Sequence, residues 1–115
     1  MSRLLEQSIV SSEELEELLR ERAEGKVDFL LIDVREDMEY KISHIVGVDL
    51  LKPTSAFQDW GDGFLRETKD QIVIFTCRTD FRSGRIQNSF KQNGHTNVLN
   101  HSGGIVSYRG EIERG

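Results

Sequence analysis

The chain of 115 residues contains one cysteine, Cys77, one proline and no long hydrophobic run. A single cysteine cannot form an internal disulfide, and the spacing of Cys and His residues does not match a zinc site. No apolar stretch approaches the roughly 20 residues that cross a bilayer. The N-terminal segment lacks the apolar stretch and the small-residue cleavage site of a secretory signal. We therefore expect a soluble cytoplasmic protein without structural metal and without membrane contact.

Acidic residues outnumber basic ones, and the net charge of −5 argues against binding to nucleic acid. The later part of the chain has the opposite balance, because residues 71–110 hold five cations and one anion, Asp80. Such a segment is typical either of a solvated helix face or of a site for a small anion. The five cations are Arg78, Arg82, Arg85, Lys91 and Arg109.

The length is that of one compact domain, so we expect residues 1–115 to form a single domain. Residues 29–32 and 72–75 are continuous apolar runs without alternation, which is typical of strands covered on both faces in a parallel sheet. Weaker strand signals lie at residues 7–10, 46–50 and 97–99.

Helix signals alternate with these strands. Ser11 and Glu14 form a capping-box pattern that opens a helix ending at Gly25. A second helix is predicted over 83–92, before the stop signal Asn93-Gly94. The order predicts an α/β domain, with a central, mostly parallel sheet of about five strands and helices on both faces. Further signals predict helices at 37–41 and from 54 to 57, and a loop at 61–63.

Cys77 follows the apolar run 72–75 by two residues and precedes the helix near Ser83. Ligands of open α/β sheets bind where a strand passes into such a loop and helix. Unpaired amides at a helix N-terminus favour an anion, and Arg78 and Arg82 would add positive charge. An isolated cysteine is otherwise a small buried hydrophobe. We expect the Cys77 side chain to lie in the loop above the sheet, as a nucleophilic thiolate, rather than in the core.

Three segments, in order, resemble the rhodanese homology domain over nearly the whole chain. Residues 31–47 resemble the first signature, a strand ending in Asp-x-Arg that leads to His-Ile-Pro-Gly-Ala. Residues 77–83 resemble the active-site pattern Cys-Arg-x-Gly-x-Arg-Ser, and residues 97–108 resemble the closing pattern of Asn-Val and Gly-Gly-x-x-x-Trp. The chain departs from these patterns at Ser43, Val46, Val48, Asp80 and Tyr108.

The resemblance implies a rhodanese-like fold and a sulfurtransferase without metal or organic cofactor. In that family the cysteine, here Cys77, takes sulfur from a donor such as thiosulfate, becomes a persulfide and passes the sulfur to cyanide or a thiol. The implied partners are a small anionic sulfur donor with a thiol or cyanide acceptor, or a protein sulfur donor or acceptor. The resemblance places the substrate-binding and anion-binding loop at Arg78, Thr79, Asp80, Phe81, Arg82 and Ser83.

Asp80 stands where the family has Gly, which suggests a positive φ that Asp tolerates. Its carboxylate would oppose ionisation of Cys77 and entry of a dianionic donor. Pairing with Arg78 or Arg82, or a turn into solvent, would leave the anion preference of the loop intact. Phe81, at the loop tip, would favour a hydrophobic or protein partner.

Two other functions compete with sulfur transfer. Phosphatases and arsenate reductases place one more residue between Cys and Arg than the four between Cys77 and Arg82. A non-catalytic or carrier module that binds a protein partner in sulfur relay or regulation is the second alternative. We expect structural roles for Asp33, Arg35, His44, His101, Trp60 and Phe64.

Overall fold

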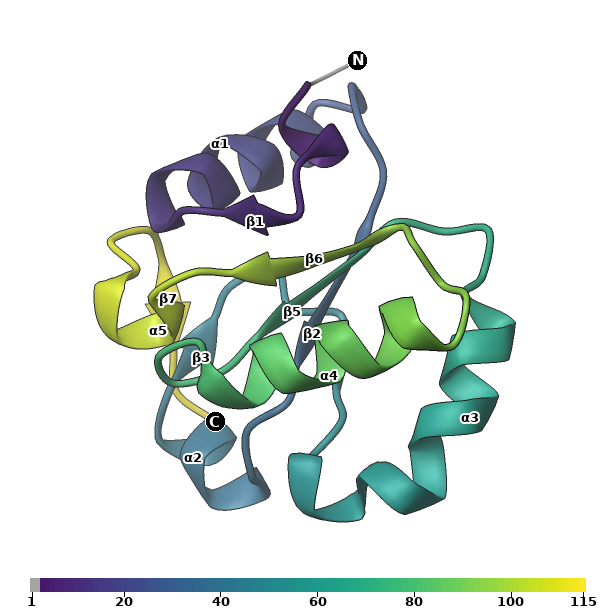
Figure 1. Cartoon of the computed structure of the whole chain (residues 1–115). Coiled ribbons are helices and arrows are strands. Elements are labelled where there is room, and N and C mark those ends of the chain that lie inside the picture. The colour runs from purple at the N-terminus through teal and green to yellow at the C-terminus, as the bar shows by residue number, and fades with distance from the viewer. Residues whose placement is uncertain (1–2) are drawn as a thin grey trace.

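The structure is a computed structural model that describes residues 3–115. Its centre is a five-stranded parallel sheet in the order β1-β6-β5-β2-β4 (Figure 1). The fold is therefore the α/β class that the sequence predicts, with five parallel strands. The strands of this sheet are β1 (Ile9–Val10), β2 (Leu30–Asp33), β4 (Leu50–Leu51), β5 (Val73–Thr76) and β6 (Val98–His101).

The two continuous apolar runs form the middle of the sheet. In β5 all four residues are buried, and in β2 only Leu30 retains partial exposure. The two strands pair in parallel from Leu30 with Val73 to Asp33 with Thr76. Burial on both faces explains why neither run alternates with polar residues.

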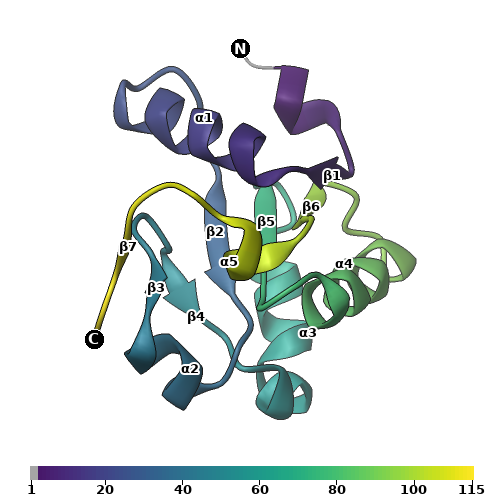
Figure 2. The same cartoon turned by 90° about the vertical axis from the view of Figure 1, so that its left-hand side faces the viewer.

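Helices cover both faces of the sheet, as Figures 1 and 2 show. Helix α1 (Ser12–Ala23) packs over one face, where Leu15 and Leu18 are fully buried. Helices α3 (Phe57–Glu67) and α4 (Phe81–Gln92) pack over the other face. The remaining helices are α2 (Asp37–Ile42), α5 (Gly104–Ser107) and the 3-10 turns η1 (Arg3–Glu6) and η2 (Thr54–Ala56).

Helix α1 begins as its capping box predicts. The Ser11 hydroxyl accepts from the Glu14 amide, and the Glu14 carboxylate accepts from the Ser11 amide, which satisfies two of the free N–H groups of a helix start. Helix α4 ends at Gln92 with Asn93 as its C-cap, and Gly94 takes a φ of 93°. Both boundary predictions are confirmed within about two residues.

The predicted loop at 61–63 is wrong, because these residues lie inside α3. The aromatic side chains of this segment stabilise the helix despite its two glycines: Trp60 lies edge-on to both Phe57 and Phe64. Gly61 is also needed for close packing, since a Cβ there would lie 2.9 Å from the Phe57 ring. Tertiary packing therefore overrides a weak local helix propensity.

The predicted strand at 46–50 is only partly present. Strand β4 begins at Leu50, whereas Gly47 turns the chain with a φ of 107°. The preceding strand β3 (His44–Ile45) pairs instead with β7 (Ile112–Glu113) in a small antiparallel sheet. A turn that needs a left-handed glycine thus separates β3, in the small sheet, from β4, in the central sheet.

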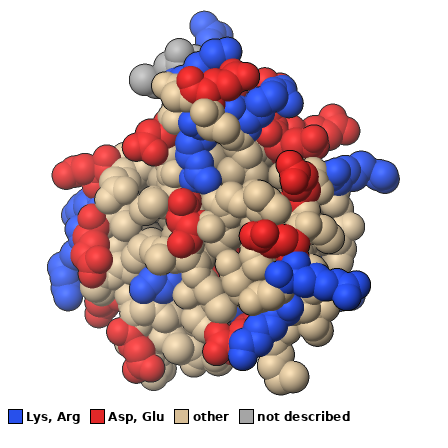
Figure 3. Space-filling view, turned by 180° about the vertical axis from the view of Figure 1, so that it is seen from behind, with Lys and Arg blue, Asp and Glu red and all other residues tan. Residues whose placement is uncertain are grey.

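Side chains of both charge signs are interspersed on the face opposite to that of Figure 1 (Figure 3). Within residues 3–115, no helix is both long and apolar enough to cross a membrane.

Candidate active site

Cys77 lies at the carboxyl end of the central strand β5, directly after Thr76. Residues 78–80 then connect it to α4, whose first residue is Phe81 and whose N-cap is Asp80. The predicted position at the end of a strand and the start of a helix is therefore confirmed.

The predicted exposure of Cys77 is wrong. Its side chain is 1% exposed and belongs to the core cluster beneath α4, together with Phe75 and Ile86. The reason is that the first turn of α4 curls over the sulfur. The Ser83 amide N–H lies 3.5 Å from Sγ, and the Ser83 hydroxyl oxygen lies 3.3 Å from it. The Ser83 amide therefore points at the sulfur atom, and the Ser83 hydroxyl lies within hydrogen-bond distance of it.

The loop backbone is held by α5. The Ile105 and Val106 amides donate to the carbonyl oxygens of Cys77 and Arg78, at 3.0 and 3.2 Å. Gly104 permits this approach, because a Cβ there would lie 2.4 Å from the Arg78 carbonyl. The loop carbonyls are thus turned toward α5. Within the described chain, the amide N–H groups of residues 78–82 donate to no other protein group, which leaves them free for an anion.

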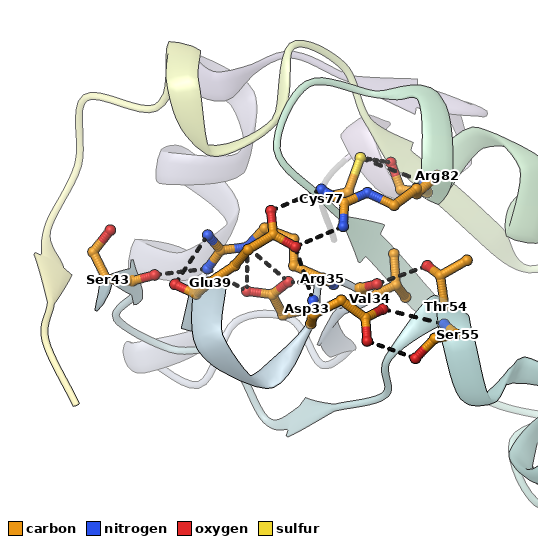
Figure 4. Close-up of polar contacts among 11 residues, drawn as sticks. Asp33, Val34, Arg35, Glu39, Ser43, Thr54, Ser55, Cys77 and Arg82 are labelled. Atoms are coloured by element: carbon orange, nitrogen blue, oxygen red, sulfur yellow. Dashed lines mark hydrogen bonds and ion pairs between the residues drawn. The ribbon is translucent and has the colours of Figure 1, made fainter. Parts of the chain in front are cut away.

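Arg82 forms a two-point ion pair with Glu39 of α2 (Figure 4). Its guanidinium nitrogens Nη1 and Nη2 lie 2.7 and 2.9 Å from the two carboxylate oxygens. The hydrogen bonds from Arg82 lower the pKa of Glu39 to about 2, and the pair raises the pKa of Arg82. The charge of Arg82 is therefore already balanced by a carboxylate.

A buried ion pair supports α2 beneath the loop. Arg35 contacts both carboxylate oxygens of Asp33, with the shortest distance 2.8 Å, and its guanidinium also donates to the Ser43 carbonyl at 2.7 Å. Because Asp33 ends β2 and Ser43 ends α2, this contact fixes the helix that carries Glu39. The arrangement agrees with the structural role expected for Asp33 and Arg35.

The other loop side chains face solvent. Arg78, Thr79, Asp80 and Phe81 are exposed, with Phe81 at 68%, and the Arg85 guanidinium lies 5.6 Å from the Phe81 ring. The predicted positive φ at Asp80 is wrong, since its φ is −167°. Asp80 makes no ion pair with any residue of the described chain, which agrees with the alternative that its carboxylate turns into solvent.

The two candidate histidines have structural contacts. His44 lies between the Tyr40 carbonyl and the Glu113 carboxylate. His101 is fully buried between the hydroxyls of Thr76 and Ser12, each at 2.7 Å. Burial lowers the pKa of His101 to about 4 and keeps the ring neutral.

Two residues at the site were missed from the sequence. The sequence predicts no role at the site for Glu39, which lies within the first family signature, or for Asn100 of β6. The Asn100 amide contacts the same Ser83 hydroxyl that lies next to Cys77. No local pattern indicates either contact, because Glu39 is 43 residues from Arg82 and Asn100 is 17 from Ser83.

Within residues 3–115, no cluster of three or more His, Cys, Asp or Glu side chains is placed to hold a metal ion. The donors that the site offers are the loop amides, the Ser83 hydroxyl and one guanidinium. They suit an anion or a sulfur nucleophile.

A family model described as the rhodanese-like domain matches residues 14–111. The chain belongs to the rhodanese-like family. This rhodanese-like domain is 30% identical over 95 residues to the probable adenylyltransferase/sulfurtransferase MoeZ of Mycobacterium tuberculosis, covering 83% of the chain but 24% of MoeZ. It is 33% identical over 88 residues to YqhL of Bacillus subtilis, covering 72% of the chain and 63% of YqhL. The chain thus spans about a quarter of the first relative and less than two thirds of the second.

Solved structures show the same fold. A rhodanese-like domain protein from Staphylococcus aureus superposes with a TM-score of 0.76 at 24% identity, covering 95% of this chain and 99% of that one. A thiosulfate sulfurtransferase from Pseudomonas aeruginosa gives a TM-score of 0.73 at 18% identity, covering 94% of this chain and 20% of that one.

Proposed function

We propose that this rhodanese-like domain is a sulfurtransferase that carries sulfur as a persulfide on Cys77. The observation that carries the proposal is the environment of Sγ: the Ser83 amide and hydroxyl lie within hydrogen-bond distance of it, and the amides of residues 78–82, in the same loop, donate to no other group of the described chain. Donors of this kind stabilise a thiolate, and they also stabilise the terminal sulfur of a persulfide.

The reaction has two displacement steps. In the first, the Cys77 thiolate attacks the outer sulfur of thiosulfate; a new S–S bond forms, and the original S–S bond breaks as sulfite leaves with the electron pair. In the second, cyanide or a thiolate attacks the outer sulfur of the persulfide. Thiocyanate or a new persulfide leaves, and the Cys77 thiolate is regenerated.

Access to the sulfur constrains the donor. Because Sγ is almost wholly buried, a donor sulfur reaches it only when side chains at the loop move aside. Arg82 is the cation next to the sulfur, yet Glu39 balances its charge. The electrostatic attraction between Arg82 and a dianion such as thiosulfate is therefore weaker than the attraction from an unpaired arginine. This favours a persulfide donor, small or carried on a protein, over thiosulfate.

A carrier module that receives sulfur from a protein remains the second candidate, and it rests on the exposed loop tip. Phe81 is 68% exposed, and the guanidinium of Arg85, also exposed, lies 5.6 Å from its ring. An apolar ring next to a free cation suits contact with a protein surface. Both candidates use the Cys77 persulfide and differ only in whether the domain turns over small donors.

The test is thiocyanate formation from thiosulfate and cyanide, compared with transfer from a small-molecule persulfide. We expect turnover with both donors, a higher kcat/KM for the persulfide, and no turnover in Cys77→Ala. Transfer that survives in Cys77→Ala would overturn the proposal. Cysteine-dependent hydrolysis of an aryl phosphate would favour the phosphatase alternative instead.

A further inference from the structure

Asn100 reaches the Cys77 site from the neighbouring strand. It lies in β6 opposite Phe75 of β5, and its amide oxygen Oδ1 contacts the Ser83 hydroxyl. Asn100 is 7% exposed, and Ser83 is fully buried. The Ser83 hydroxyl is therefore shielded from solvent, and its hydrogen bonds depend on Asn100, on the sulfur and on the Asp80 carbonyl.

The Ser83 hydroxyl has one proton and three acceptors within reach. Besides Asn100 Oδ1, these are Cys77 Sγ and the Asp80 carbonyl oxygen, each at 3.3 Å. A hydroxyl donates one proton and accepts through its lone pairs. When Ser83 donates to Asn100, it gives no hydrogen bond to the sulfur. The direction of the Asn100 contact therefore decides whether the sulfur receives the hydroxyl proton.

We propose that Asn100 is a positioning residue that directs the Ser83 hydroxyl to Cys77. An asparagine amide has an oxygen acceptor at one end and an NH2 donor at the other, and rotation about its last torsion exchanges them. With the NH2 end toward Ser83, the Asn100 N–H donates to Ser83 Oγ. The hydroxyl proton then points to Sγ.

This arrangement gives both the thiol and the thiolate a hydrogen bond with the Ser83 hydroxyl. In the thiol, the S–H donates to Ser83 Oγ and the hydroxyl donates to Asn100 Oδ1. When the S–H proton leaves to solvent, the chain reverses, and Asn100 donates to Ser83, which donates to the thiolate. Hydrogen bonds to charged groups are stronger than neutral ones, so the reversed chain favours the thiolate.

The role of Asn100 in sulfur transfer rests on the proposed function. Its effect on the ionisation of Cys77 can be measured without any sulfur transfer. Because Cys77 is the only cysteine, the ultraviolet absorbance of the thiolate reports on this residue alone when Cys77→Ala serves as the blank. We would titrate the wild type, Asn100→Leu, Ser83→Ala and the double variant. Gln87→Leu is the matched control, since Gln87 is a buried amide between α4 and β6 that donates to the Ser8 and Val98 carbonyls.

Asn100→Leu and Ser83→Ala should each move the titration midpoint upward by about one pH unit, a roughly tenfold loss of thiolate at a fixed lower pH. Asn100→Leu should add nothing in the Ser83→Ala background, and Gln87→Leu should leave the midpoint in place. An equal shift from Asn100→Leu in both backgrounds, or no shift, would overturn the inference. If the leucine variant does not fold, Asn100→Asp replaces it; it only accepts hydrogen bonds, and its shift should shrink when Ser83 is Ala.

The two proposals fail separately. Persulfide formation in the wild type with an unmoved midpoint in Asn100→Leu contradicts the role of Asn100 alone. The expected midpoint shifts without any persulfide in the wild type support that role and contradict the proposed function.

Discussion

Arg82 and Glu39 form a two-point ion pair, in which each of the two terminal guanidinium nitrogens donates to one carboxylate oxygen, at 2.7 and 2.9 Å. The pair joins the first turn of α4 to α2 beside Cys77 (Figure 4). It holds the loop in place, and it also balances the charge that would attract an anionic donor.

We predict that Glu39→Gln raises kcat/KM for thiosulfate several-fold, because the charge of Arg82 is then free to attract the dianion. The gain should shrink at high salt, since salt screens partly exposed charges. Steady-state rates at two ionic strengths test this. Glu67→Gln is the control, as it removes the same charge at the end of α3, away from the carboxyl ends of the strands. Equal gains in the two variants would contradict the role of the ion pair.

Asp80→Asn should have a smaller effect than Glu39→Gln. The Asp80 carboxylate is exposed and unpaired within the described chain, and exposed charges interact weakly with their neighbours. We expect thiosulfate turnover to rise by at most about twofold at low salt and less at high salt. Its φ of −167° suits any residue, so stability should stay unchanged. A larger gain than in Glu39→Gln would show that Asp80 governs the choice of donor.

Gly104→Ala should disrupt the active-site loop. At a φ of 61°, the new Cβ would lie 2.4 Å from the Arg78 carbonyl and 2.5 Å from that of Thr79, and backbone atoms cannot yield as a flexible side chain can. We expect lost sulfur transfer and a loss in unfolding free energy well above the about 1 kcal/mol of backbone strain. Urea unfolding and rate assays test this. Gly25→Ala is the matched control, because Gly25 also has a positive φ but no atom lies within 4 Å of its Cβ position.

His101 should make stability fall with acid. Its pKa is about 4 in the folded protein, because burial disfavours the charged ring, whereas an unfolded histidine titrates near 6.5. Between these values the unfolded chain binds the proton and the folded chain does not, so stability is full above pH 6.5 and is lost as pH falls toward 4. The free energy of unfolding falls by about 3 kcal/mol once the pH is below the pKa of the folded protein.

Urea unfolding at several pH values measures this loss. His101→Gln should be less stable at neutral pH, since it disturbs the contacts to Thr76 and Ser12, but its stability should fall less steeply with acid. The variant keeps the contribution of His95, whose pKa is also lowered by burial. An unchanged pH slope would show that His101 is not the titrating group.

Local sequence features predicted the parts of the fold that depend on local physics. The unbroken apolar runs placed β2 and β5, and the capping box placed the start of α1. The prediction of a loop at 61–63 was wrong because the structure of this segment depends on tertiary contacts. Its glycines indicate a turn locally, whereas the rings of Phe57, Trp60 and Phe64 hold the segment helical through tertiary contacts.

The site was predicted at the level of its loop and not of its contacts. The sequence showed that Cys77 ends a strand before a helix, but the burial of the sulfur depends on how the first turn of α4 closes over it. Likewise the Gly103-Gly104 pair was visible as a motif, while the close approach of Arg78 that requires Gly104 exists only in three dimensions. Contacts such as Arg82 with Glu39 join distant segments and have no local signal.

The most direct test of the central claim is the intact mass of the protein after incubation with a sulfane-sulfur donor. Thiosulfate and a small-molecule persulfide should each be tried, followed by addition of a thiol. We predict a gain of one sulfur, about 32 Da, that is absent in Cys77→Ala and removed by the thiol. A protein that gains no sulfur from either donor, or gains it equally in Cys77→Ala, would contradict the account.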